Sequence, residues 1–454
     1  MISVRAAAAD LTTGARAHER TVRIWGLAVM GLLVGYLLLG RAFAYLGLPG
    51  PLPIFLGEIV LVLFFVFHPE ASTLRWFSSM VRNEALSSAS WALYASLAYG
   101  VVLTLRGVFG EEDALQAIQN LVFNVYPLYL FLGLWLGEHD RGFVRRFVLV
   151  LAWANAIYGI LYIGLLNGVN VFVPGTSVFL FNAPQGQMIV LLGLLTYHSE
   201  LRKVWFPLFV NFVILLGLQT RAHWAGMLLA VPVWAVLSRR LGRFVAAVTV
   251  GAILLGVAFV ADVRLPSALT RGPTDVSARS VFGAAVAPFD EQTAAQYTEQ
   301  AGLYSGTAEW RRDWWSDIWD SVHITTGRTL FGYGYGYYLK QTSDIGSGKE
   351  DLRTPHNVFF YALGYGGWVG VVLFGLVMIT VGRLLWVAFR RTGDPFGLSV
   401  MFLGLGIGLF TNYFETPFAA IPYWLLLGLS AAPALRPDDG AAPGPSLASS
   451  STGG

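Results

Sequence analysis

Long apolar runs, separated by short polar segments, dominate the sequence. A helix needs about 20 residues to cross roughly 30 Å of hydrocarbon, and runs near that length recur along the whole chain. They predict an all-α, polytopic membrane protein with about 12 transmembrane helices. The predicted spans are residues 24–46, 53–67, 88–106, 117–137, 142–166, 183–198, 204–219, 222–238, 243–262, 357–388, 397–412 and 417–433.

Basic residues alternate along the chain with these spans. Cytoplasmic loops of inner-membrane proteins carry an excess of Lys and Arg. With the N-terminus inside, the inside loops hold most of these residues, and the short outside loops hold few beyond Arg41, Arg106 and Arg221. We therefore predict a bacterial inner-membrane protein with both termini in the cytoplasm.

This orientation divides the chain into five segments. Residues 1–23 form a cytoplasmic N-terminal segment, 24–262 carry the first nine spans, and 357–433 carry the last three. Between them, 263–356 form a periplasmic loop, and a loop of such length is usually functional. The tail 434–454, rich in Pro, Gly and Ser, is predicted to be disordered and cytoplasmic.

Composition agrees with this picture. Hydrophobic residues make up 55% of the 454 residues and charged residues only 13%, whereas soluble domains carry about a quarter charged residues. The absence of cysteine excludes disulfides, thiolate metal ligands and a cysteine nucleophile. The sequence pI is near 9.0, but the basic residues lie where topology places them, so nucleic acid is not an expected partner.

The periplasmic loop contains two notable motifs. Residues 309–320 have helical spacing, and one stripe gathers the apolar side chains of Trp310, Trp314, Trp315, Ile318 and Val322. Such a helix would lie flat at the membrane interface or pack against protein. The glycine-alternating run 331–336 follows no strand of a βαβ unit, so it predicts a tight turn that lets the backbone approach another surface.

Candidate chemistry gathers outside the membrane. His356, in Arg353-Thr354-Pro355-His356-Asn357, directly precedes a span; an imidazole there could act as a base or simply bond to water or backbone. Arginine grips phosphate through bidentate bonds, and the outside candidates are Arg221, Arg311, Arg312 and Arg353.

Other classes of site find little support. No outside segment has two histidines at helical spacing, and the carboxylates do not cluster, so no metal site is predicted. Glu58 and Glu415 lie at or near spans, where a carboxylate is either functional or buried in a structural hydrogen bond.

Taken in order, the motifs resemble those of the O-antigen ligase superfamily, which also contains O-antigen polymerases. The resemblance runs from Thr220 to about Gly370. It is carried by Thr220-Arg221, Glu309-Trp310-Arg311 with Trp314-Trp315, Phe331-Gly332-Tyr333-Gly334, Arg353-Thr354-Pro355-His356-Asn357 and Gly364-Tyr365-Gly366-Gly367.

The resemblance implies a C-type glycosyltransferase-like fold and metal-independent, inverting transfer without a cofactor. A glycan would pass from undecaprenyl diphosphate to a hydroxyl of lipid A–core or of another glycan, within the membrane lipids. It implies that Arg221 and His356 are catalytic, with His356 orienting or deprotonating the acceptor. Arg221 and Arg311 would bind the donor's diphosphate and stabilise the leaving group, and His356 could instead hydrogen-bond the phosphates. Arg312 is the alternative to Arg311, since the two point about 100° apart on a helix and only one should face the cavity. Arg353 and Asn357 would bind substrate.

Several functions remain open. A ligase transferring finished polysaccharide to lipid A–core and a polymerase of O-antigen or exopolysaccharide fit the motifs equally. A transporter of lipid-linked glycan would need charged residues lining a path inside the spans, whereas here the distinctive charges lie outside. A non-catalytic scaffold gives no reason for the positions of Arg221 and His356.

Overall fold

The computed structural model describes residues 2–47, 54–68, 84–110, 112–166, 169–197, 203–217, 221–266, 275–287, 289–299, 301–343 and 354–435. This part of the chain is helical, as predicted, apart from a short antiparallel ribbon formed by β1 (Arg264–Pro266) and β2 (Asp275–Ser277). The predicted tail beyond residue 435 lies outside the described residues.

Within the described residues, six helices are long and apolar enough to cross a membrane: His18–Leu39, Glu84–Phe109, Ala114–His139, Phe143–Leu166, Val358–Thr392 and Pro417–Leu435. Shorter apolar helices cover Leu56–Phe67, Gln187–Tyr197, Trp205–Leu215, Ala222–Leu237, Phe244–Val260 and Phe396–Gly408. Every predicted apolar run overlaps one of these helices. The helices therefore support a membrane protein, and the number that crosses the bilayer beyond six stays a prediction.

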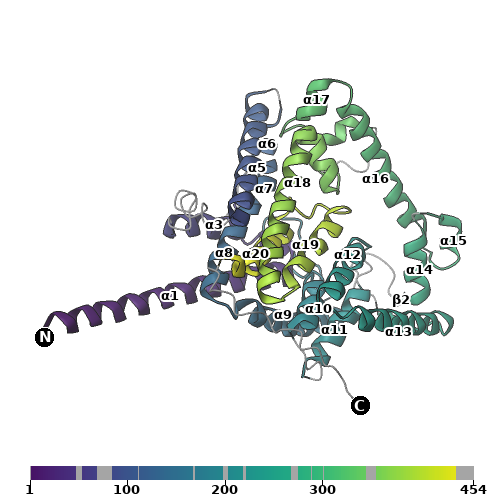
Figure 1. Ribbon diagram of the computed structural model, residues 1–454. Coiled ribbons are helices and arrows are strands. Elements are labelled where there is room, and N and C mark those ends of the chain that lie inside the picture. The colour runs from purple at the N-terminus through teal and green to yellow at the C-terminus, as the bar shows by residue number, and fades with distance from the viewer. Residues whose placement is uncertain are drawn as a thin grey trace, which may run out of the picture.

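Helices from both ends of the chain form one bundle (Figure 1). In the bundle's main core, buried side chains of the N-terminal half pack against those of the last helices. The bundle helices are α1 (Ile2–Leu39), α2 (Arg41–Ala44), α3 (Leu56–Phe67), α5 (Glu84–Phe109), α6 (Ala114–Asn120), α7 (Val122–Val125), α8 (Tyr129–His139), α9 (Phe143–Leu161), α10 (Gln187–Tyr197), α11 (Trp205–Gly217), α12 (Arg221–Leu237), α13 (Leu241–Val260), α18 (Val358–Thr392), α19 (Phe396–Gly408) and α20 (Pro417–Ala431).

Two predicted spans are not single straight helices. Residues 117–137 are divided among α6, α7, a 3-10 turn at Tyr126–Leu128 and α8, because Pro127 cannot continue a regular helical ladder. The span predicted at 357–388 corresponds to α18, which is interrupted at Gly367 by a non-helical φ of 59° and ψ of −160°.

Glycines let α12 and α19 approach closely. A Cβ on Gly406 would lie 2.7 Å from the Cα of Gly226, so neither position has room for a side chain without movement. Small residues serve this purpose in membrane bundles because packing, rather than the hydrophobic effect, holds such helices together. This contact fixes the start of α12 beside the end of α19.

The predicted periplasmic loop is largely structured. It contains the β1–β2 ribbon, α14 (Ala278–Val286), α15 (Glu291–Ala295), α16 (Ala301–Val322) and α17 (Thr326–Phe331). In Figure 1 these helices form an arm that leaves the end of α13 and returns to the bundle through α17 beside α18.

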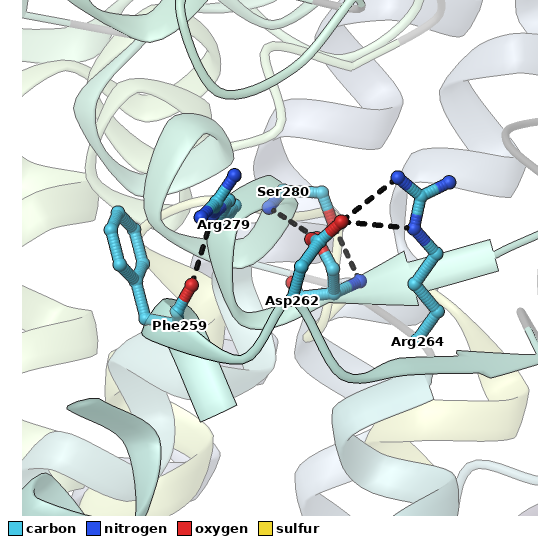
Figure 2. A network of polar contacts seen from close by, with 6 residues as sticks. Phe259, Asp262, Arg264, Arg279 and Ser280 are labelled. Carbon is cyan, nitrogen blue, oxygen red and sulfur yellow. Dashed lines mark hydrogen bonds and ion pairs between the residues drawn. The ribbon is translucent and has the colours of Figure 1, made fainter. Parts of the chain in front are cut away.

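Polar contacts attach the arm to α13 (Figure 2). Arg264 forms an ion pair with Asp262 at 2.9 Å, and Arg279 at the start of α14 donates to the Phe259 carbonyl at 2.9 Å. Ser277 and Ser280 satisfy each other's backbone N–H groups as a reciprocal cap of α14. The ribbon and α14 therefore start from a defined point at the membrane-side end of the arm.

The glycine-alternating run makes the close backbone approach that its sequence predicts. The Tyr333 and Gly334 N–H groups donate to the carbonyls of Gly364 and Tyr365, each at 2.9 Å. Gly332 (φ 61°) and Gly367 (φ 59°) face each other, and a Cβ on either would lie about 2.5 Å from backbone atoms of the other segment. We call this contact the glycine clasp; it fixes the arm against the first half of α18.

Candidate functional site

His356 lies in the short segment Thr354–Asn357, which joins the arm to α18. Its backbone has a φ of 53°, in the left-handed region that residues other than glycine rarely adopt. Strained backbone persists only where surrounding contacts impose it, and such positions cluster at active sites. The preceding Pro355 restricts the local chain, and its carbonyl accepts a hydrogen bond from the Trp315 indole at 2.7 Å.

Helix α16 supplies the surroundings of this histidine. The Trp310 ring meets the His356 ring edge-on, with centroids 6.2 Å apart. The Arg311 guanidinium lies over the same Trp310 ring, 5.3 Å from its centroid. The Trp310 ring thus contacts both the arginine and the histidine, which limits the rotamers of both side chains.

The predicted apolar stripe of α16 faces protein. Trp314, Ile318 and Val322 are fully buried, and the Trp314 indole donates to the Leu339 carbonyl at 3.1 Å. Of the two arrangements that the sequence left open, the structure therefore has the packing helix. This packing sets the rotation of α16, and with it the direction in which its arginines point.

The electrostatic environment keeps His356 uncharged. Burial, and secondarily the nearby Arg311 cation, lower the pKa of His356 to about 4. The ring is therefore neutral at physiological pH, with one nitrogen able to accept a hydrogen bond. A neutral imidazole can accept a proton, but burial and the neighbouring positive charge make it a weaker base than an ordinary histidine until an anion binds beside it.

Asn357 fastens the segment at two places. Its side-chain oxygen accepts from the N–H groups of Phe359 and Phe360, at 2.8 and 3.2 Å, and so caps α18. Its amide nitrogen donates to the Leu409 carbonyl at 2.9 Å. In this structure the predicted substrate-binding side chain is thus engaged in holding the α18 start against the α19–α20 loop, residues 409–416.

Glu415 lies in that loop with both carboxylate oxygens buried. Neither oxygen makes a well-formed hydrogen bond to the described residues, although Thr354 and the local backbone are close enough to oppose the effect of burial. Burial raises the pKa of Glu415 to about 8. A protonated carboxyl therefore lies beside the segment that carries the neutral histidine.

Glu58, the other carboxylate that the sequence placed at or near a span, has a structural role. It accepts hydrogen bonds from the Tyr126 hydroxyl and from the Phe55 N–H, both at 3.1 Å, and so caps α3. The Glu58 carboxylate is hydrogen-bonded, whereas the Glu415 oxygens have no well-formed hydrogen bond among the described residues. The structure thus distinguishes two carboxylates that the sequence could not.

The predicted arginines differ in placement. Arg311 is half-buried beside His356, whereas Arg312 is exposed. Arg221 is the first residue of α12, and its side chain lies outside the described part of the structure. Arg353 also lies outside the described residues. The structure thus brings together Arg311, His356 and Asn357 of the predicted set.

A cavity of about 320 Å³ adjoins the same loop. It is lined by the ends of α1, α9 and α19 and by the starts of α10, α12 and α20, which are all predicted to face outside. Its polar lining comes from the side chains of Tyr162, Asn182, Gln185, His223, Thr411, Asn412, Tyr413 and Thr416.

Sequence reasoning missed this lining, because uncharged amides and hydroxyls at span ends break no topological rule. It named Trp310 and Trp315 as members of an apolar stripe and of the family motifs, but not as neighbours of the His356 segment. Among the described residues, no group of three or more His, Asp or Glu side chains is placed to hold a metal ion.

Comparison with known families agrees with the motifs. Residues 206–375 match the family model described as O-antigen ligase. This region contains α12, the arm, the glycine clasp and the segment Thr354–Asn357. The match confirms the resemblance to the O-antigen ligase superfamily and implies a glycosyltransferase-like membrane enzyme. The chain has no match among curated proteins.

Proposed function

From its O-antigen ligase family region at residues 206–375, we propose that the protein transfers a glycan from undecaprenyl diphosphate to a hydroxyl acceptor at the periplasmic face of the inner membrane. The observation that carries the proposal is the cluster of Arg311, Trp310 and His356. It places fixed positive charge beside a neutral imidazole, at the loop predicted to face outside.

The chemistry requires one displacement. The acceptor oxygen attacks the anomeric carbon as the bond from that carbon to the diphosphate oxygen breaks, and the bonding electrons leave with the diphosphate. Attack from the face opposite the leaving group inverts the anomeric centre. Arg311, with Arg221, binds the diphosphate and stabilises the charge that develops on its bridging oxygen.

His356 accepts the acceptor's proton. In the free protein Arg311 helps to keep its pKa low, at about 4. A bound diphosphate places negative charge near Arg311 and offsets that influence, so the imidazole becomes a stronger base once the donor is in place. The base is thus strengthened by the substrate whose displacement it assists.

The acceptor decides between two activities. Transfer to lipid A–core makes the protein a ligase, and transfer to another lipid-linked glycan makes it a polymerase of O-antigen or exopolysaccharide. We propose the ligase. The polymerase is kept as the second candidate, because the Trp-Arg and Pro-His-Asn motifs fit both activities.

A purified-component assay tests the proposal. The protein in detergent would be mixed with undecaprenyl-diphosphate-linked glycan and lipid A–core in the presence of EDTA, and the products separated on a gel. Wild type should form glycan-bearing lipid A–core, and His356→Ala and Arg311→Ala should lower the rate at least about 100-fold, as expected when a base or a leaving-group contact is removed.

Arg312→Ala is the matched control. It removes an equal charge from the next position of the same helix, where the side chain is exposed, and should leave the rate within about twofold. Longer carrier-linked chains in place of modified lipid A–core would identify the polymerase. A wild type that forms neither product would refute the proposal in favour of a transporter.

A further inference from the structure

We infer that the cavity beside the α19–α20 loop is a subsite for neutral sugar residues of the substrate, in which Gln185 and Asn412 bind sugar hydroxyls. The inference rests on the proposed function and adds to it the part of the substrate that this cavity recognises. Only His223 of the lining falls within the region matched by the family model, so the match assigns the cavity no ligand.

The part of the lining that the structure describes suits the sugars of a lipid-linked glycan better than its other parts. Among the described residues, the wall contains no Lys, Arg, Asp or Glu, whereas a diphosphate would need cations. An isoprenoid chain would match the apolar half of the wall but would leave the amides and hydroxyls of the polar half facing hydrocarbon, which is unfavourable. Sugar hydroxyls both donate and accept hydrogen bonds, and a wall of amides, hydroxyls and tyrosines offers both.

Several polar atoms in this wall have no protein partner within the described structure. They are the Tyr162 hydroxyl, the His223 Nδ1 and the Thr416 hydroxyl, each buried. Buried polar atoms are almost always satisfied in native proteins, so each unsatisfied one needs an explanation. All three belong to residues of the cavity wall, so this wall has hydrogen-bonding capacity that the described protein leaves unused.

The backbone that carries the two amides is anchored to the bundle. The Gln185 N–H donates to the Leu37 carbonyl at 2.9 Å. The Gln185 side chain packs against Gly40, since a Cβ added to that glycine would lie 3.2 Å from the side-chain nitrogen. Asn412 follows Thr411, whose N–H and hydroxyl both bond the Ile407 carbonyl at 3.1 Å. The backbone that carries each amide is therefore held by the bundle helices before a ligand binds.

The cavity also lies next to the proposed reaction centre. The α19–α20 loop contacts the His356 segment at both of its ends, through Leu409 to Asn357 and through Glu415 to Thr354. Residues of the same loop between these contacts, Asn412 among them, line the cavity. The α19–α20 loop therefore contacts both a sugar bound in the cavity and the segment that carries His356.

Binding measurements in nanodiscs test the inference without requiring turnover. The probes are undecaprenyl-diphosphate-linked glycan, undecaprenyl diphosphate without glycan, and the oligosaccharide released from lipid A–core. Wild type should bind the glycan-bearing lipid at least about tenfold more tightly than the bare lipid, as two neutral hydrogen bonds allow. Gln185→Leu and Asn412→Leu should each reduce this preference by about 2- to 10-fold and leave the affinity for bare lipid unchanged.

Two controls separate this inference from the proposed function. Gln292→Leu makes the same substitution at an exposed position of α15 and should change nothing. Arg311→Ala should weaken both lipids equally, because it removes a diphosphate contact. Thermal unfolding of each variant in detergent identifies any that does not fold, and the other amide variant then decides the result.

The source of the sugar follows from which affinity changes. Loss of preference for the glycan-bearing lipid assigns the cavity to the donor, and loss of affinity for the lipid A–core oligosaccharide assigns it to the acceptor. Equal binding of both lipids by wild type, with no effect of either amide variant on any probe, would overturn the inference while diphosphate recognition stands. If wild type binds neither lipid, the proposed function and the inference both fail.

Discussion

Replacing Gly367 with alanine should break the glycine clasp. The glycine adopts a φ of 59° and a ψ of −160°, a region that is essentially open only to glycine and costs other residues about 1–3 kcal/mol. The new Cβ would also lie 2.5 Å from the Leu330 carbonyl carbon and oxygen. Since unbonded carbon atoms settle near 3.5–4.0 Å, the two segments would have to part by about 1 Å.

That separation would disrupt the two backbone hydrogen bonds from Tyr333 and Gly334 to α18, each 2.9 Å long. Each is worth about 0.5–1.5 kcal/mol net. Together with the strain, the loss comes to roughly 2–6 kcal/mol. The displaced elements are the arm and the first half of α18, and both carry the residues around His356, so glycan transfer should fall with stability.

Gly375→Ala is the matched control, because it lies in the same helix with nothing within 4 Å of its missing Cβ. In a helix interior this change should stabilise by about 0.5–1 kcal/mol. Apparent melting temperature in detergent and the transfer assay would be measured on both variants. If Gly367→Ala melts and transfers as Gly375→Ala does, the clasp does not hold the site together and the reasoning is refuted.

Three further predictions concern the segment before α18 and its neighbouring loop. Because burial raises the pKa of Glu415 to about 8 from 4.5, the folded state keeps a proton that the unfolded state loses. As the pH rises from 4.5 to about 8, the free energy of unfolding of wild type should therefore fall by up to about 1.4 kcal/mol per pH unit. Glu415→Gln should flatten this fall when melting is measured against pH; parallel curves for the two proteins would contradict this. The acid limb of the kcat/KM profile should lie near pH 4, the pKa of His356 in the free protein. The acid limb of kcat should lie at higher pH, because the bound diphosphate offsets Arg311. A kcat/KM limb near the ordinary histidine pKa would contradict the effect of burial and Arg311. Asn357→Ala should lower the free energy of unfolding by about 1–2 kcal/mol, because the cap of α18 is lost. Asn357→Asp keeps the cap but loses the hydrogen bond to the Leu409 carbonyl, so it should reduce glycan transfer with little change in melting temperature. If Asn357→Asp transfers like wild type, the hydrogen bond to Leu409 has no role in positioning His356.

The sequence by itself determined the membrane-helical class, the amphipathic helix at 309–320 and the backbone role of the glycine-alternating run. Each depends on local physics: hydrophobic length, a 3.6-residue period and the absence of a Cβ. The same local signals marked His356 and the pair Arg311 and Arg312 as candidates, because fixed charge and imidazole stand out in an otherwise apolar chain.

Only the tertiary structure decided which candidates meet. The choice of Arg311 over Arg312 depends on how α16 is rotated, and the burial of Trp314 against Leu339 sets that rotation. The difference between Glu58 and Glu415 depends on which of them finds a partner elsewhere in the chain. The cavity is built from six helix ends that are far apart in sequence, and its amides carry no charge that a single-sequence pattern would reveal. Long-range packing, not local preference, brings such groups together, and for that reason they were found only in the folded chain.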